Sequence, residues 1–344
     1  MSLPDSGRVL SIQSHVSYGY VGGKAATFPL QLLGYDVDVV NTVNFSNHSG
    51  YRRFGGTKAN ATELTEILAI MKTNGVLQPS RLLTGFIPGA EALTAVANVA
   101  RNLIEETPNL IYLLDPVMGD AGVLYVAADV IPVYKSLLPK STIITPNWFE
   151  VEVITDVKII DATSLRQALT ILHTTYAVPN VVISSIPVKE WLTEFMPSSL
   201  RPDETSDWLL CLASSRVDGL SGPSIVYAAC VPFIPGYFSG VGDLFSALVL
   251  GHYSPSAQAA LPAAVSQALS KTHGILRLTD AYASTLPEAD RQPTDDELDA
   301  ADPERRVRRM RGRELRLIQG QNILRGDAVE RSWQLSEWVD FWRD

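Results

Sequence analysis

Two glycines and an aspartate stand where an irregular segment leads into an apolar helix late in the chain: Gly240, Gly242 and Asp243. The first backbone N–H groups of a helix have no partner within it, so they point outward and can bind phosphate oxygens. Glycines at this place let such oxygens come close to the backbone. A bound phosphate would repel Asp243, so we expect this side chain to act on a proton or through a bridging metal ion. The pattern predicts transfer of a phosphoryl group to a hydroxyl.

Further oxygen-bearing side chains follow short apolar runs. Asp115 and Asp120 share one loop after the run at residues 110–114, and one or two carboxylates beside nucleotide phosphates are enough to hold Mg²⁺. A plain polar turn explains that loop equally well. Asn147 and Glu150 lie three residues apart at an expected helix start. This spacing could place both side chains on a metal-bound water, but a helix-capping role is the favoured interpretation.

The elements around these residues alternate between strand and helix from the N-terminus to about residue 185. We expect strands near residues 8–14, 36–43, 82–86, 110–114, 141–144 and 181–183. Between them we expect helices near 24–33, after the capping pair Asn60 and Glu63, over about 17 residues from Ala90, and from Thr163 through Leu172. The alternation predicts an α/β fold with a mostly parallel sheet covered by helices on both faces. Residues 208–213 and 225–233 predict an antiparallel pair at one edge.

Parallel strands carry their loops at the same, carboxyl edge of a sheet. The polar residues that follow the expected strands should therefore meet in one cleft, with Asp243 at its glycine loop beside them. This set is Ser14, Asp115, Asp120, Asn147, Glu150 and Ser184.

Two common nucleotide-binding motifs fail in this chain. The run Gly22–Lys24 resembles a Walker loop, but Tyr18 stands at the first glycine position and Ala25 follows the lysine. The run Gly240–Gly242 begins like a dinucleotide fingerprint, but Phe245 takes the third glycine position. The sequence therefore excludes a P-loop ATPase and a nicotinamide-dependent dehydrogenase.

The segment Phe45–Tyr51 mixes hydroxyl, amide and aromatic side chains between a strand and a helix. An aromatic small molecule that forms hydrogen bonds would suit it. By itself it is an ordinary polar loop, in which His48 is more often a local hydrogen-bond partner than a catalyst.

Composition limits the partners and the location. The 344 residues carry a net charge of −9, which argues against nucleic acid or an anionic membrane as a partner. The chain opens without a basic and apolar leader, and no apolar run has the length of a membrane span, so we expect a soluble, cytoplasmic protein. Cys211 and Cys230 are expected to be buried thiols.

The composition changes near the C-terminus. We expect a main domain over residues 1–285, a charged, flexible insertion over 286–312, and a strand at 315–318 with a Trp-rich helix that complete the same domain over 313–344. The basic run Arg305–Arg309 would suit nuclear import or RNA binding. A solvated, self-neutralising block of charge is the favoured interpretation.

Taken together, the motifs resemble the pyridoxal kinase family within the ribokinase-like kinases. Six blocks follow its pattern in order: Arg8–Val16, Ala25–Gln31, Phe45–Tyr51, Asp115–Asp120, Ile144–Glu150 and Gly240–Phe245. The resemblance spans about residues 8–285 and resumes near Arg313. It implies a ribokinase-like three-layer α/β/α fold, with a mostly parallel sheet and an antiparallel edge. The implied activity is ATP-dependent phosphorylation of the 5′-hydroxymethyl group of pyridoxal, pyridoxine or pyridoxamine, with Mg²⁺ and K⁺, in a homodimer.

The resemblance also implies residue roles. Asp243 would be the base, at an anion site formed with Gly240 and Gly242. The substrate-binding residues would be Ser14, Ser49, Phe45, Phe86 and Asp243. The nucleotide-binding residues would be Asp115, Asn147, Glu150, Ser184, Ser185, Val241 and Gly242, and the metal would lie near Asp115, Asp120 and Glu150. Val241 replaces a usual threonine, Phe86 a usual tyrosine and Ser49 a usual threonine. These departures bear on nucleotide affinity and K⁺ dependence.

Two alternatives stay open. A hydroxymethylpyrimidine or sugar kinase of the same superfamily shares the Gly-x-Gly-Asp anion site but differs in the substrate loop, and the segment Ser46–Tyr51 favours a B6 vitamer. A weakly active, kinase-like protein that binds a B6 vitamer is the alternative outside the enzymes. Retention of Asp115 and Asp243 speaks against it.

Overall fold

The computed structural model describes residues 7–202, 207–216, 222–291, 296–326 and 333–343. Its main sheet has ten strands in the order β12-β11-β10-β9-β8-β5-β4-β1-β2-β3. The strands are β1 (Arg8–Val16), β2 (Asp36–Phe45), β3 (Gly56–Lys58), β4 (Arg81–Thr84), β5 (Ile111–Leu114), β8 (Ile143–Ile144), β9 (Asn180–Pro187), β10 (Trp208–Ser215), β11 (Ile225–Pro232) and β12 (Ser336–Glu337).

Strand direction divides this sheet into a parallel centre and antiparallel edges. The six strands from β9 to β2 pair in parallel, whereas β10, β11 and β12 add antiparallel strands at one side and β3 adds one at the other. The predicted antiparallel edge is therefore confirmed, and it continues into β12. The carboxyl ends of the parallel strands lie at one edge, as the predicted site requires.

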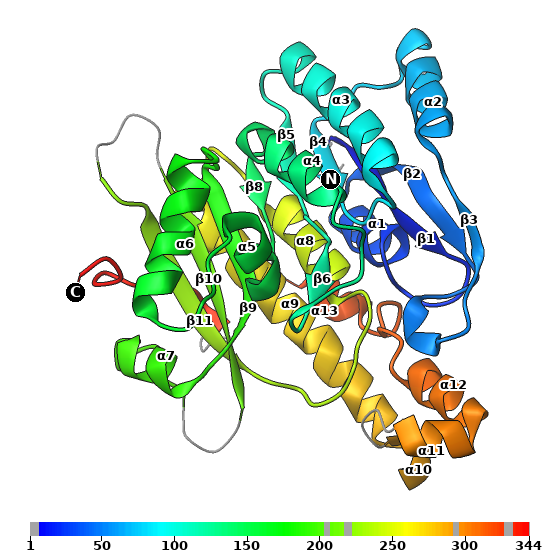
Figure 1. Ribbon diagram of the computed structural model, residues 1–344, viewed down its shortest axis with the longest axis vertical. Helices are drawn as coiled ribbons and strands as arrows, with labels where there is room; N and C mark the ends of the chain where they lie inside the picture. Colours follow the sequence, from blue (N-terminus) through cyan, green and yellow to red (C-terminus); the bar gives the residue numbers. More distant parts are fainter. Residues whose placement is uncertain (1–6, 203–206, 217–221, 292–295, 327–332, 344) are drawn as a thin grey trace.

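Helices cover both faces of the sheet (Figure 1), because successive strand residues point to opposite sides. Leu10 and Ile12 pack into one core, and Val9 packs into the other. The first core is covered by α2 (Ala61–Thr73), α3 (Ala90–Glu106), α4 (Val130–Leu137), α5 (Trp148–Thr155), α6 (Ala162–Thr174) and α7 (Glu190–Phe195). The second is covered by α1 (Gly23–Leu32), α8 (Val241–His252), α9 (Ala260–Ala283) and α13 (Gln321–Arg325). The three-layer α/β/α prediction is confirmed.

Local predictions hold where the sequence carries a strong signal. The helix from Ala90 has the expected 17 residues. The Asn60 side chain accepts a hydrogen bond from the Glu63 amide at 2.9 Å and caps α2. Cys211 and Cys230 are buried free thiols on neighbouring strands. No helix in the described part of the chain is long and apolar enough to cross a bilayer.

The charged segment after residue 285 is helical where the structure describes it. It forms α10 (Glu288–Arg291), α11 (Asp296–Ala301) and α12 (Pro303–Gly312), which lie together beside one end of α9 (Figure 1). Asp299 accepts hydrogen bonds from Arg305 at 2.7 Å and Arg309 at 2.6 Å, and all three residues are buried. The prediction of self-neutralising charge is therefore confirmed. The prediction that the charge is solvated is wrong for these residues, because the ion pairs lie inside the packed helices.

The C-terminal prediction needs a second correction. Residues 315–316 have no regular secondary structure and residues 317–318 lie in a turn, so the expected strand is wrong. Leu315 and Leu317 bury their side chains in the core under α9 instead of pairing at a sheet edge. The Trp-rich end contributes β12 and a turn, where a helix was expected. There Trp338 and Phe341 pack on Phe195 of α7, with ring centroids 4.7 and 5.5 Å away.

Candidate active site

The backbone around Asp243 is fixed by close approaches that only glycine allows. Gly240 precedes α8 with φ of +81°, and a Cβ there would lie 2.0 Å from the carbonyl oxygen of Tyr20. Gly22 has φ of +53°, and a Cβ there would lie 2.1 Å from the carbonyl oxygen of Ser14. The Gly22 amide donates to Oδ2 of Asp243 at 2.8 Å. Ser14, Gly22 and Asp243 thus meet although Asp243 lies 221 residues after Gly22.

The sequence does not single out Gly22 as a partner of Asp243, because the run Gly22–Lys24 resembles only an incomplete Walker loop. One sequence signal could have identified it. Gly22 lies in the loop that follows the first strand, and a glycine there allows the close approach of another backbone segment. The hydrogen bond from its amide positions the Asp243 carboxylate.

The start of α8 is open toward solvent. Gly242 is exposed, and a Cβ there would meet nothing within 4 Å. Leu244 makes the first hydrogen bond of the helix ladder, to the carbonyl oxygen of Gly240 at 3.0 Å. The amides of Val241, Gly242 and Asp243 precede that bond, so they form the N-terminal turn that helix geometry offers to an anion.

A second acid lies close to Asp243. Asp115 follows β5 and is buried, and its Oδ2 accepts a hydrogen bond from Ser246 of α8 at 3.0 Å. The Ser246 hydroxyl is also 2.8 Å from that of Thr145, after β8. Sequence reasoning missed both hydroxyl residues, since an apolar helix face and a strand end gave no sign of contact.

Burial acts on both acids, and the negative charge of Asp243 also acts on Asp115. Burial, and then the negative charge of Asp243, raise the pKa of Asp115 to about 8, against the opposing hydrogen bond from Ser246. Burial also raises the pKa of Asp243, while the Gly22 amide partly offsets the effect. A raised pKa makes the Asp243 carboxylate a stronger proton acceptor, which suits a general base.

Asn147 and Glu150 form the capping box of α5. The Asn147 side chain accepts from the Glu150 amide and Glu150 Oε2 accepts from the Asn147 amide, both at 2.9 Å. Their other groups hold the loop after β5: Glu150 Oε1 accepts from the Met118 amide at 2.9 Å, and Asn147 Nδ2 donates to Gly119 O at 2.8 Å. Burial, and then the charge of Asp115, raise the pKa of Glu150 well above its ordinary value. The capping interpretation is confirmed, and it also positions the carboxylate loop.

Asp120 lies apart from this buried cluster. It is exposed in the hairpin of β6 (Gly119–Asp120) and β7 (Val123–Leu124), and its Oδ1 accepts from the Ala121 amide at 2.7 Å. Across the described ranges, no group of three or more His, Cys, Asp or Glu side chains is arranged to hold a metal ion. Asp115, Asp120 and Glu150 therefore do not form a ready-made three-carboxylate centre.

Tyr125, after the hairpin, links the acids electrostatically. The residue is 58% exposed as a whole, and desolvation of its hydroxyl raises its pKa. The negative charges of Glu150, Asp115, Asp243 and Asp120 raise that pKa further, which places the hydroxyl within electrostatic reach of all four. Sequence reasoning did not single out this tyrosine.

Two of the predicted substrate residues lie at the ends of β2 and β4, the strands on either side of β1, and a third lies on the loop after β2. Phe45 ends β2 and packs on Phe54, with ring centroids 5.6 Å apart. Phe86 follows β4, and its carbonyl oxygen accepts from the Thr42 hydroxyl at 2.7 Å. Ser49 is exposed at the start of the short 3-10 helix η1 (Ser49–Tyr51). The described contacts do not join these three residues to Asp243 directly.

The predicted nucleotide residues Ser184 and Ser185 lie half-buried on β9. The Ser184 amide donates to the carbonyl oxygen of Pro146 at 3.1 Å. These serines therefore lie in the second half of β9, level with the loop that leads from β8 into the Asn147 capping box.

Glu314 braces the loop that carries Ser49. Its Oε1 accepts from the Tyr51 hydroxyl at 2.7 Å and lies 3.0 Å from His48 Nε2, and its Oε2 accepts from the Tyr20 amide at 2.9 Å. Burial would raise the pKa of Glu314, but hydrogen bonds from His48, Tyr51 and the Tyr20 amide outweigh it and lower that pKa. The prediction that His48 is a local hydrogen-bond partner is confirmed by its ring nitrogen accepting from the Gly50 amide. Glu314 itself had no sequence signal, because its partners lie more than 260 residues away.

Comparison with known proteins adds the following. The family model described as phosphomethylpyrimidine kinase matches residues 35–280. A pyridoxal kinase of Arabidopsis thaliana is 38% identical over 334 residues, which cover 96% of this chain and 95% of that protein. A pyridoxal kinase of Bos taurus is 38% identical and covers 79% of this chain and 85% of its own length. The solved structure of a pyridoxal kinase from Leishmania donovani in complex with ADP and pyridoxine has a TM-score of 0.76 at 30% identity, covering 97% of this chain and 99% of that one.

Proposed function

This chain belongs to the phosphomethylpyrimidine kinase family and, by identity over most of its length, to the pyridoxal kinases, so we propose that it phosphorylates B6 vitamers with ATP. The acceptor is the 5′-hydroxymethyl group of pyridoxal, pyridoxine or pyridoxamine. The observation that carries this proposal is Asp243, held by the Gly22 amide beside Ser14 at the open start of α8. A carboxylate and a set of free amides at one point match the two needs of phosphoryl transfer to an alcohol.

In the reaction, Asp243 takes the proton from the 5′-hydroxyl group of the vitamer. The oxygen of that hydroxyl attacks the γ-phosphorus of ATP at the same time. The new O–P bond forms while the bond between the γ-phosphorus and the bridging oxygen breaks, and ADP leaves. The amides of Val241 and Gly242 stabilise the charge that builds up on the γ-phosphate oxygens. The hydrogen bond from Gly22 fixes the orientation of the Asp243 carboxylate throughout.

The acidic residues fit Mg²⁺. Asp115 is a buried carboxylate whose pKa is raised by burial and by Asp243, so a divalent cation would relieve both effects. Mg²⁺ keeps several waters and needs only one or two protein carboxylates beside the phosphates. Asp115 would hold the ion, and Glu150 would act through a water because its oxygens already accept backbone amides, whereas Asp120 stays the third proposed ligand from the same loop. When bound, the ion neutralises phosphate charge.

The remaining roles follow the family resemblance. Ser14 and Ser49 bind the ring substituents, and Phe45 and Phe86 pack on the ring. Nucleotide binding falls to Asp115, Asn147, Glu150, Ser184, Ser185, Val241 and Gly242. We further propose a K⁺ requirement weakened by Val241, a homodimer, and a cytoplasmic location.

The test is ATP consumption by the purified protein with each B6 vitamer and with hydroxymethylpyrimidine, at saturating Mg²⁺ and K⁺. We expect turnover with at least one vitamer. Hydroxymethylpyrimidine is the second candidate substrate, because the description of the matching family model names a substituted methylpyrimidine. Turnover with that alcohol alone would replace the B6 assignment, and no turnover with any of the four would refute a kinase.

A further inference from the structure

A hydrogen bond between two side chains joins the two loops to which the proposed function assigns different ligands. We call residues 45–51 the substrate loop and residues 236–240 the glycine loop. Nδ1 of His48 in the substrate loop lies 3.1 Å from the hydroxyl of Ser239 in the glycine loop. His48 directly precedes the proposed substrate residue Ser49, and Ser239 directly precedes the glycine before α8. The bond therefore links the two binding segments, although its partners are 191 residues apart in the chain.

The direction of this bond follows from the other contacts of the His48 ring. The Gly50 amide can only donate, and it lies 3.1 Å from Nδ1, so Nδ1 carries no hydrogen and accepts. Nε2 then carries the ring hydrogen and donates it to Glu314 Oε1 at 3.0 Å, while the Ser239 hydroxyl donates to Nδ1. His48 is 9% exposed, so water competes little for these bonds. Glu314 and Gly50 thus fix the ring that receives the Ser239 hydroxyl.

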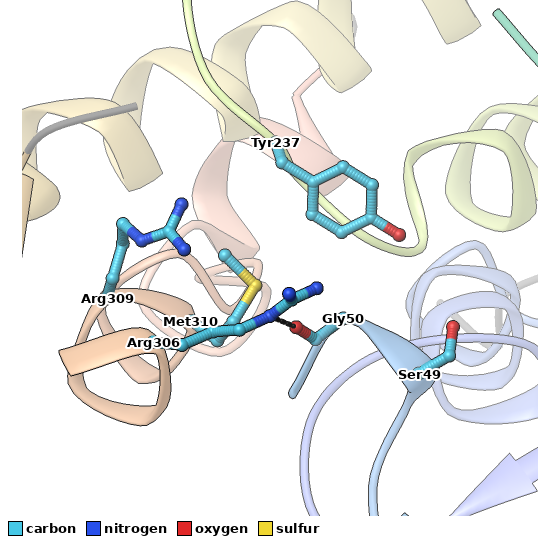
Figure 2. A pocket seen from close by; sticks show the side chains of 6 residues that line it. All are labelled: Ser49, Gly50, Tyr237, Arg306, Arg309 and Met310. Carbon is cyan, nitrogen blue, oxygen red and sulfur yellow. Dashed lines mark hydrogen bonds between the residues drawn. The ribbon is translucent and has the colours of Figure 1, made fainter. Parts of the chain in front are cut away.

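The two loops also meet at a second point. Tyr237 lies beside Gly50 (Figure 2), and a Cβ at Gly50 would be 3.0 Å from the Tyr237 ring. Arg306 of α12 holds the same glycine by donating from Nε to its carbonyl oxygen at 2.7 Å. The ring contact is not directional, whereas a hydrogen bond restricts both distance and angle. Among the hydrogen bonds between described residues, the one from Ser239 to His48 is the only one that joins these loops.

We propose that Ser239 is a positioning residue that couples vitamer binding to nucleotide binding. A vitamer that orders the substrate loop holds His48 in place, and His48 in turn holds Ser239 and the glycine loop beside the γ-phosphate. Each ligand then lowers the cost of ordering the backbone that binds the other. Because such coupling is reciprocal, each ligand tightens the other by the same factor. This inference rests on the proposed function, which assigns one loop to each ligand.

The test is calorimetric titration of the full chain with the non-hydrolysable β,γ-imido analogue of ATP and Mg²⁺, with and without saturating pyridoxine. In the unmodified chain, pyridoxine should tighten binding of the analogue about fivefold or more. Ser239→Ala should reduce this factor to below about twofold, because the net contribution of one hydrogen bond is of that size. Each ligand alone should bind this variant with nearly unchanged affinity, since every group assigned to either ligand is retained. Ser239→Thr keeps the hydroxyl and should keep the factor.

Ser214→Ala is the matched control, because Ser214 also bonds a histidine. Its hydroxyl lies 2.8 Å from His173 Nε2, and Ser214 pairs with Val181 near the amino end of β9, away from the strand ends that carry the site. Ser214 and His173 are both buried, so this variant should unfold at a lower temperature. It should nevertheless keep the coupling factor. The control therefore separates a loss of stability from a loss of coupling.

Four results would overturn the proposal. They are an unmodified chain that binds both ligands without mutual tightening, a folded Ser239→Ala variant that keeps the full factor, a Ser239→Thr variant that loses as much of it as Ser239→Ala, and a Ser214→Ala variant that does the same. The titration needs no turnover, so the two proposals fail in different ways. An unmodified chain that binds neither ligand would refute the proposed function as well, whereas binding of both without coupling refutes the role of Ser239 alone.

Discussion

The two glycines before the proposed base serve different purposes. Gly240 has a positive φ, and its missing side chain makes room for the Tyr20 carbonyl. Gly242 has open space around it, so packing within the chain does not require a glycine there. Its small size is useful only if something outside the chain comes close. This contrast separates a structural glycine from one that leaves room for a phosphate.

We expect Gly240→Ala to destabilise the fold by about 1–3 kcal/mol, because the new side chain meets backbone and strains a left-handed residue. Gly242→Ala should leave the melting temperature unchanged and raise KM for ATP, because its methyl group would occupy the anion position. Thermal unfolding and steady-state kinetics measure the two effects. An unchanged KM in Gly242→Ala would show that the nucleotide does not approach α8 there.

At the scale of elements, α5 shows which contacts of a helix can be predicted from the sequence and which cannot. The spacing of Asn147 and Glu150 predicts the capping box, because capping depends on residues three apart. The bonds from the same side chains to Met118 and Gly119 were not predictable, since they join segments about 30 residues apart. The strand expected at 315–318 failed for the same reason. Its alternating apolar residues fit a strand, and only the tertiary arrangement shows that they pack under α9.

We expect Asn147→Ala to cost about 0.5–2 kcal/mol of stability through the lost cap. It should also raise KM for ATP, because the loop that carries Asp115 and Asp120 loses its tie at Gly119. Asn60→Ala is the matched control, since Asn60 caps α2 away from the acids. That control should lose similar stability with unchanged KM, and equal kinetic effects in the two variants would contradict the positioning role of Asn147.

Across the whole molecule, a residue late in the chain holds loops from its first 51 residues. Glu314 accepts hydrogen bonds from Tyr20 and Tyr51 and contacts His48, although it follows the charged helices that the sequence treats as an insertion. The sheet, its two layers and the convergence of polar strand ends were predictable, because they follow from local periodicity and the handedness of parallel connections. The contacts of Glu314 were not predictable, because no local sequence pattern relates residues that are so far apart in the chain.

The lowered pKa of Glu314 gives a test with a definite sign. An acid whose pKa falls on folding stabilises the native state above its ordinary value of 4.5, and that stabilisation is lost as the pH falls through the lowered value. Glu314→Gln should therefore cost about 1.5–3 kcal/mol near pH 7, and progressively less as the pH falls below 4.5, as measured by denaturant unfolding. Glu304→Gln, which removes an exposed ion pair with Arg53, should cost about 0–1 kcal/mol. A penalty for Glu314→Gln that grows toward low pH would contradict this account.

The central claim is that Asp243 acts as the general base in phosphoryl transfer. The most direct test follows ester formation by ³¹P NMR for the unmodified chain and for Asp243→Asn. Each reaction contains ATP, Mg²⁺, K⁺ and pyridoxal. The unmodified chain should convert pyridoxal to its 5′-phosphate. Asp243→Asn should be slower by about 10²–10⁴-fold, because it lacks the proton acceptor, while it still binds ATP and unfolds at a similar temperature. A folded Asp243→Asn variant that forms the ester at the unmodified rate would contradict the central claim.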